Sequence, residues 1–391
     1  MTAEADFGQF RAQFPTTETM VYLNSGSYGL LGNSVRAAME AYLADRIAKG
    51  ADWGAWVALE DEVRRRMARL LGGDVDEVAV TASASAGINA VASSIDFSAR
   101  RKAVVSNYEF PTSAQIWHAQ EKRGAQVVHV AEAEDRTIPL AHFDAAIDHD
   151  TAIVALSHVC YRHGGKLPAD QIREIARIAH ERGALVILDC YQSIGTEQID
   201  VRALGVDFCV GGMLKYLLGS AGSGFLWVRD ALTSVLVPGT SGWFAQADAN
   251  MMDIFAHDPS PSARRFQGGT PPVPSLYAAK AGLDLILDLG VEAIERRVRA
   301  LTRLALDRLT EADIGVATPD DDALRGPMIA IPVRDEDAFV AQLFAQNIVT
   351  SSRDGNIRAG FHAYNNEADV ERFVDALVRS GQCFARREAV G

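Results

Sequence analysis

Several features are scarce in this chain of 391 residues, and each scarcity excludes a class of protein. No apolar run approaches the roughly 20 residues that a membrane-spanning helix needs. Basic residues are outnumbered, with 38 Lys and Arg against 51 Asp and Glu, and the formal net charge is −13. Because nucleic acid and anionic lipid repel such a charge, we expect neither as a partner. A small-molecule ligand is the better expectation.

Cysteine is also scarce, and the few thiols lack the spacing of a metal site. The four are Cys160, Cys190, Cys209 and Cys383. We expect reduced thiols in packing roles and no bound metal ion. Residues 1–6 lack the basic and apolar regions of a signal peptide, so a cytoplasmic protein is expected.

The common nucleotide-binding motifs are missing. The glycines of residues 219–224 do not form G-x-G-x-x-G, and they lead into a strand where a dinucleotide site needs a helix. The P-loop spacing is absent as well. His118, His158 and His163 have no metal partners at ligand spacing, so structural roles are favoured for them.

What is present is an alternation of apolar strands and helices between residues 77 and 229. Residues 171–182, for example, repeat apolar positions at helical spacing. Strands joined by crossover helices predict an α/β fold with a mostly parallel seven-stranded sheet and helices on both faces. The candidate strands are 78–82, 102–106, 125–130, 152–159, 185–189, 208–212 and 225–228.

The remaining segments suggest four parts. Residues 1–20 are expected to form an N-terminal arm that packs on a small domain, and residues 21–265 the large domain. Residues 266–290 are expected to be an interface loop and linker, because the preceding stretch is irregular and rich in Pro and Gly. Residues 291–391 then form a small C-terminal α+β domain. Its expected elements are helices at 291–309, 336–346 and 367–379 and strands at 328–332, 348–351 and 357–360.

A lysine and an acid carry the first chemical signal. Lys215 follows Gly211 and Gly212 and stands between two apolar runs, at a bend between strands. A Lys of lowered pKa forms Schiff bases with carbonyls, although a solvated turn lysine is favoured from this stretch alone. Asp189 changes that balance, because it ends the buried run 185–188 where open α/β sheets bind ligands. We therefore expect both residues to face one crevice.

Three further segments carry ligand-binding signals, each with a structural alternative. Ala84 and Ser85 open a helix whose N–H groups and dipole suit a phosphate, although Ser83 or Ser85 also suits simple capping. Phe110 follows a strand and suits stacking on a flat heterocycle, although most such aromatics are core. The Gly- and Ser-rich loop 24–32 allows close backbone approach, although a plain turn is as good a reading.

One ligand uses all of these groups, and it is pyridoxal 5'-phosphate. Asp189 would pair with the pyridinium nitrogen, and Phe110 would stack on the ring. Ser85 would hold the phosphate, and Lys215 would form the Schiff base and later move protons.

With these residues in these positions, the sequence resembles the fold-type I, class V aminotransferase family of pyridoxal-phosphate enzymes. This family includes cysteine desulfurases, kynureninases and isopenicillin N epimerase-like enzymes. The resemblance extends over nearly the whole chain. Its most specific parts are Ser157-His158-Val159, Asp189-x-x-Gln192, Lys215 with its Gly/Ser loop, and residues 266–271.

The resemblance implies further roles. Gln192 would hydrogen-bond the ring's phenolic oxygen, and Thr270 would reach the phosphate of the neighbouring subunit in a homodimer. Arg358 would clamp the α-carboxylate of an amino-acid substrate, a role that suits a guanidinium, whereas its structural alternative is a surface salt bridge. Asn24 and Ser25 would line the substrate side.

The chain also departs from the family pattern. Desulfurases carry a mobile cysteine where residues 349–355 have none, and they stack a His where this chain has Phe110. Many members place Ser or His where this chain has Gly212 and Leu214, so its phosphate cup is thinner or is completed by other groups.

We expect an enzyme that acts at the α-carbon of an amino acid, most of all a C–S or side-chain-cleaving lyase. An aminotransferase or an epimerase is the alternative within the enzyme class. Outside it, a non-catalytic pyridoxal-phosphate-binding regulator is the rival, which the presence of Arg358 argues against, because a binder needs no carboxylate clamp.

Overall fold

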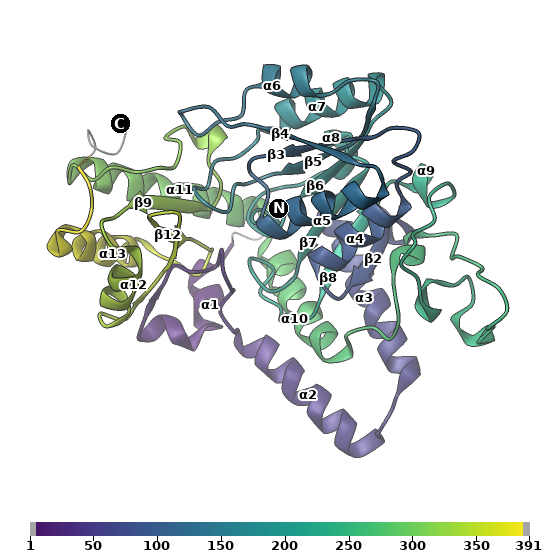
Figure 1. The fold of residues 1–391 in the computed structure, drawn as a ribbon. Coiled ribbons are helices and arrows are strands. Elements are labelled where there is room, and N and C mark those ends of the chain that lie inside the picture. Colours follow the sequence, from purple (N-terminus) through teal and green to yellow (C-terminus); the bar gives the residue numbers. More distant parts are fainter. Residues whose placement is uncertain (1–4, 386–391) are drawn as a thin grey trace.

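The structure is a computed structural model that describes residues 5–385. Its centre is a seven-stranded sheet of order β2-β8-β7-β6-β5-β3-β4, in which only β8 runs antiparallel to its neighbours (Figure 1). The mostly parallel sheet predicted from the sequence is therefore confirmed. The strands are β2 Val78–Thr81, β3 Lys102–Ser106, β4 Gln126–Val130, β5 Thr151–Ser157, β6 Leu185–Asp189, β7 Phe208–Gly212 and β8 Gly224–Val228.

Helices cover both faces of this sheet, because its strands are apolar on both faces. Along β3, Val104 packs into one apolar cluster while Ala103 and Val105 pack into another. Buried side chains of α4 (Ala84–Ser94) and α5 (Pro111–Ala119) belong to the second cluster. The first cluster contains side chains of α3 (Trp53–Leu71), α6 (Leu140–Ala146), α7 (Ala169–Glu181) and α8 (Val201–Leu204). Continuous apolar runs are typical of strands enclosed in this way.

Helix α10, Val273–Leu289, corrects the expectation that residues 266–290 are loop and linker. Leu276, Leu283 and Ile286 are fully buried on one side of it, where it packs against α2 (Asn33–Lys49) and α3. The stretch before α10 is rich in Pro and Gly, and for this reason the predicted loop was extended over residues that are helical. A short helix, α9 (Asp230–Thr233), precedes that stretch.

A smaller sheet of order β11-β12-β9 lies beside the large one (Figure 1). Its strands are β9 Met328–Pro332, β11 Ser351–Arg353 and β12 Asn356–Gly360, and its helices are α11 Val291–Glu311, α12 Glu336–Phe344 and α13 Glu367–Ser380. A second small pair joins β1 (Val21–Tyr22) in parallel to β10 (Ile348–Val349).

The N-terminal segment is tied to this C-terminal part. Helix α1 spans Phe7–Ala12, and Arg11 within it binds Asp369 through both carboxylate oxygens, at 2.7 and 3.2 Å. The division of the chain into four domains remains a proposal, and residues 1–4 and 386–391 lie outside the described residues. No helix within residues 5–385 is long and apolar enough to cross a membrane.

The pair of Arg11 and Asp369 yields a stability prediction. Asp369 is buried, so Arg11→Met removes the cation that binds its carboxylate, leaves it only the N–H donors of Asn365 and Asn366 among the described residues, and keeps an apolar stem at residue 11. We expect the free energy of unfolding to fall by about 2 kcal/mol, measured by urea denaturation. Arg65→Met is the matched control, because Arg65 pairs with Glu62 at an exposed site and should change stability by less than about 0.5 kcal/mol. Equal losses in both variants would contradict the role of Arg11.

Candidate active site

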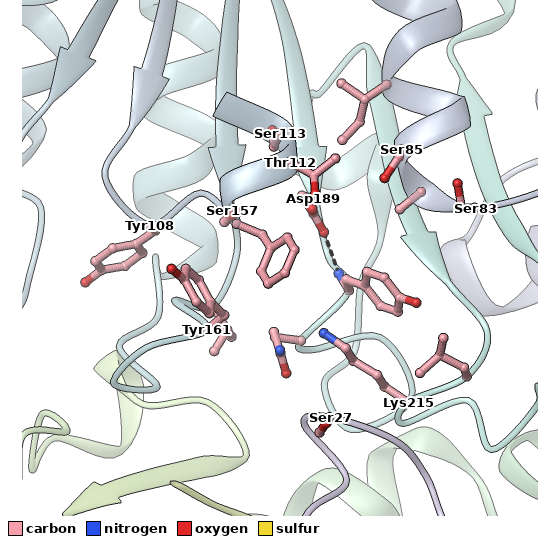
Figure 2. A pocket seen from close by; sticks show the side chains of 17 residues that line it. Ser27, Ser83, Ser85, Tyr108, Thr112, Ser113, Ser157, Tyr161, Asp189 and Lys215 are labelled. Carbon is pink, nitrogen blue, oxygen red and sulfur yellow. Dashed lines mark hydrogen bonds between the residues drawn. The ribbon is translucent and has the colours of Figure 1, made fainter. Parts of the chain in front are cut away.

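A cavity of about 280 Å³ lies where the carboxyl ends of the central strands meet. The end of β6, the loop between β7 and β8, the start of α4 and the segment around α5 all open onto it, as Figure 2 shows. Parallel strands deliver side chains to such an edge. The lining residues are Ser27, Ser83, Ala84, Ser85, Ile88, Tyr108, Phe110, Thr112, Ser113, Ser157, Val159, Tyr161, Asp189, Tyr191, Gln192, Leu214 and Lys215.

Lys215 and Asp189 face this same cavity, as the sequence predicts. Burial lowers the pKa of the Lys215 amine to about 8, opposed by the charge of Asp189 and reinforced by Arg358 and Arg353. Burial raises the pKa of the Asp189 carboxyl, opposed by the N–H of Tyr191 and by Lys215. The cavity therefore holds an amine that loses its proton more readily than an exposed lysine and a carboxyl whose charged form needs a cationic partner.

Four other residues that were predicted to bind the cofactor also line the cavity. They are Ala84, Ser85, Phe110 and Gln192. Ser83 is the residue that caps α4, accepting from the Ala86 N–H at 3.1 Å. Of the two serines considered as helix caps, Ser83 is the one that caps α4. The Phe110 ring is 42% exposed and meets the Tyr161 ring edge-on at 5.0 Å. It stands at the mouth of the cavity rather than in the core.

Arg358 lies on β12 behind the cavity wall and not in a surface salt bridge. Its guanidinium donates to the Tyr161 carbonyl oxygen at 2.6 Å and to the Ser351 hydroxyl at 3.0 Å. The Arg358 Nε is buried and has no hydrogen-bond partner among the described residues. Tyr161, which lines the cavity, connects Arg358 to it.

The loop at 24–32 is placed differently from the expectation in one respect. The Ser25 side chain is fully buried and hydrogen-bonds the Tyr364 hydroxyl, so it does not line the cavity, whereas Ser27 does. Asn24 also lies outside the cavity lining, with its Oδ1 buried and unpartnered within residues 5–385. The close approach that this loop permits is to the lysine loop, since the Gly29 N–H donates to the Leu214 carbonyl at 2.9 Å.

Thr270 lies apart from the other predicted residues. It lines a different cavity, of about 240 Å³, together with Glu60 and Gln267. Within one chain it does not meet Lys215, and its reach into a neighbouring subunit stays a prediction.

The sequence reasoning missed several lining residues, of which Tyr191 is the most prominent. The centre of its ring lies 4.2 Å from the Lys215 amine. Its place between Asp189 and Gln192 was the signal that pointed to it. Glu109 was also missed; it is buried behind the site, where burial and the charge of Asp189 raise its pKa to about 7.

Three side chains outside the cavity come together although their spacing gave no metal signal. Ligand atoms of Glu132, Cys160 and His163 lie within 4.8 Å of one another. Arg162 and Arg136 also bind Glu132, at 3.0 and 3.1 Å. Two guanidinium groups already neutralise this carboxylate, which makes the cluster a poor cation site.

The cavity residues fit the pyridoxal 5'-phosphate predicted from the sequence. The Asp189 carboxyl suits a protonated ring nitrogen, and the Lys215 amine, whose lowered pKa makes its uncharged form accessible, suits an aldehyde. The first N–H groups of α4 have no acceptor within the helix and suit a phosphate. The Gln192 Oε1 is buried and unpartnered among the described residues, which leaves it available to a group on the ring.

Comparison with known proteins agrees with this fit. A probable cysteine desulfurase of Pyrococcus abyssi is 25% identical, covering 94% of this chain and 96% of that protein. A kynureninase of Pseudomonas fluorescens is 27% identical, covering 92% and 89% of the two chains. YcbU, an uncharacterized aminotransferase of Bacillus subtilis, is 32% identical over 371 residues, covering 94% and 96%.

A solved structure shares the fold. A variant of C-DES with glycine covalently linked to its PLP cofactor matches with a TM-score of 0.86 at 20% identity, covering 94% of this chain and 98% of that one. The family model for aminotransferase class V matches residues 34–373. The chain therefore belongs to the class V aminotransferase family of pyridoxal-phosphate-dependent enzymes.

Proposed function

We propose that this enzyme is a lyase that acts at the α-carbon of an amino acid and cleaves its side chain at a C–S or C–C bond. The observation that supports this proposal most directly is the buried Lys215 amine, of pKa about 8, that faces Asp189 across the cavity. When bound there, pyridoxal 5'-phosphate supplies an electron sink for negative charge at the α-carbon.

Residues of the chain itself transfer the proton, hold the ring nitrogen protonated, orient the substrate and exclude water. The Lys215 amine takes and returns the α-proton, because its lowered pKa, about 8, makes the uncharged form far easier to reach than in an exposed lysine. The Asp189 carboxylate holds a proton at the ring nitrogen. Arg358 orients the substrate carboxylate, for which its unpartnered Nε is available. Phe110 and Tyr161 close the mouth and limit the entry of water.

The lining of the cavity favours a lyase that needs no persulfide. It contains no cysteine among the described residues, and Cys160, Cys190 and Cys209 are buried elsewhere. A persulfide needs a thiol that reaches the substrate, so the lining argues against desulfurase chemistry although a probable desulfurase is among the relatives. Kynureninases among the relatives support side-chain cleavage, and the 32% identity to an aminotransferase supports transamination as the second candidate.

We also propose that the enzyme is a cytoplasmic homodimer in which Thr270 completes the neighbouring phosphate site. Its place in a cavity that Lys215 does not line supports this. The buried free thiols Cys160, Cys190 and Cys209 suit a reducing compartment.

A panel of amino acids tests the reaction type. We expect one of them to release a side-chain fragment, scored as ammonia with pyruvate, as alanine, or as sulfide, without any added 2-oxo acid. A strict requirement for a 2-oxo acid would favour the aminotransferase. Absorbance of the bound cofactor that no amino acid perturbs would favour a regulatory binding protein.

Replacement of the lysine tests its role as the base. Lys215→Ala should lower kcat by at least about 10²- to 10⁴-fold, because it removes the amine assigned to the Schiff base and to proton transfer, while the phosphate and ring contacts still bind the cofactor. Lys280→Ala is the control, since Lys280 lies on α10 in a surface pair with Asp284. Turnover by Lys215→Ala near that of the control would refute the assignment.

The pKa of Lys215 yields a prediction about pH. A lowered pKa means that the amine becomes uncharged above about pH 8, whereas an exposed lysine stays charged to about pH 10.5. In cofactor-free protein, labelling of Lys215 by pyridoxal and borohydride, followed by mass spectrometry, should rise with a midpoint near pH 8. Asp189→Asn should move the midpoint lower, because the carboxylate charge raises the pKa. A midpoint near 10.5 would contradict the buried site.

A further inference from the structure

The phosphate end of the cavity lacks side-chain donors on the lysine loop. Gly212 has no side chain, and Leu214, which lines the cavity, has an apolar one. A dianionic phosphate needs several donors, so another element has to provide them.

Tyr191 fills the space that a side chain at residue 212 would take. An ideal Cβ built on Gly212 would lie 2.2 Å from both Cζ and the hydroxyl oxygen of Tyr191. A Cβ does not approach a non-bonded atom so closely, so even alanine at 212 would displace the phenol. The two residues are therefore a matched pair, in which the glycine makes room for the hydroxyl.

The start of α4 occupies the neighbouring position in the same way. Gly224 is the strand partner of Gly212, and an ideal Cβ on it would lie 2.8 Å from the Ala84 nitrogen. Partner residues point to the same face of a sheet, with Cβ positions about 5 Å apart. The Tyr191 hydroxyl and the first N–H groups of α4 thus meet side by side on one face.

The Tyr191 hydroxyl is a suitable donor. The hydrogen bond that Tyr191 makes to Asp189 uses its backbone N–H, at 2.8 Å, which leaves the hydroxyl to the cavity. Burial, with Asp189 and Tyr28 nearby, raises the pKa of the phenol, so it keeps its proton. Tyr191, Ser83, Ala84 and Ser85 all line the cavity.

We propose that the Tyr191 hydroxyl binds the cofactor's phosphate together with the N–H groups at the start of α4, and so completes the cup that Gly212 and Leu214 leave open. This inference rests on cofactor binding in the proposed function and adds a binding residue to it. It does not depend on which reaction the enzyme catalyses.

The test compares two ligands that differ only in the phosphate. Apo-protein is titrated with pyridoxal 5'-phosphate and with pyridoxal, and the ratio of the two Kd values is compared between wild type and variant, because the internal hemiacetal that pyridoxal forms contributes equally to each. Tyr191→Phe keeps the aromatic ring and removes the hydroxyl. We expect Tyr191→Phe to raise the Kd of pyridoxal 5'-phosphate by about 10- to 100-fold and to leave the Kd of pyridoxal nearly unchanged.

The matched control is Tyr161→Phe. Tyr161 lines the same cavity but lies on the side opposite Ser83 and Ser85 in Figure 2. The Tyr161→Phe variant should leave the ratio of Kd values unchanged. A change of threefold or less in this ratio for Tyr191→Phe, or equal weakening of both ligands, would overturn the inference.

A swap of donors gives a second measurement. Tyr191→Ala opens the space over residue 212, and adding Gly212→Ser then places a hydroxyl there. The double variant should bind pyridoxal 5'-phosphate at least threefold more tightly than Tyr191→Ala alone, and no recovery would count against the proposal. Wild-type protein that binds both ligands equally would instead refute the phosphate site, whereas an active Lys215→Ala would refute only the reaction assigned to it.

Discussion

The site depends on burying an amine and a carboxyl at one edge of a sheet. Desolvation disfavours the charged form of each group, lowering the pKa of Lys215 and raising that of Asp189. Each also supports the charge of the other, so neither is driven fully neutral. This opposition keeps the amine ready to accept a proton and the carboxyl ready for a cationic ring nitrogen. The cavity and the elements around it serve to hold this pair.

Glycines set the distances between those elements. Gly212 and Gly224 form a pair on adjacent strands with no room for a Cβ at either. Gly29 permits the loop after β1 to bind the Leu214 carbonyl, which fixes the backbone beside Lys215. Close backbone approach of this kind requires a residue without a side chain. The glycines therefore shape the binding site although none of them supplies a functional group.

Much of the fold and of the site was predictable, because the signals were local. Strands β3, β6 and β7 are continuous apolar runs with clear ends, and their bounds match the expected ones. Phe110, Asp189 and Lys215 meet because strand ends share one edge, a rule that needs no side-chain detail. Helix α10 was missed because its apolar stripe follows a stretch rich in Pro and Gly, and its helical state depends on packing against α2 and α3.

By itself the sequence determined which chemical groups stand at which strand ends, since composition and spacing decide how strands and helices alternate. It could not decide where individual side chains point. Ser25 turns to Tyr364 instead of the cavity, and Tyr191 occupies the space over Gly212. Both outcomes depend on contacts between residues far apart in the chain, where shape and close packing select the rotamer. Only the tertiary structure brings those partners together.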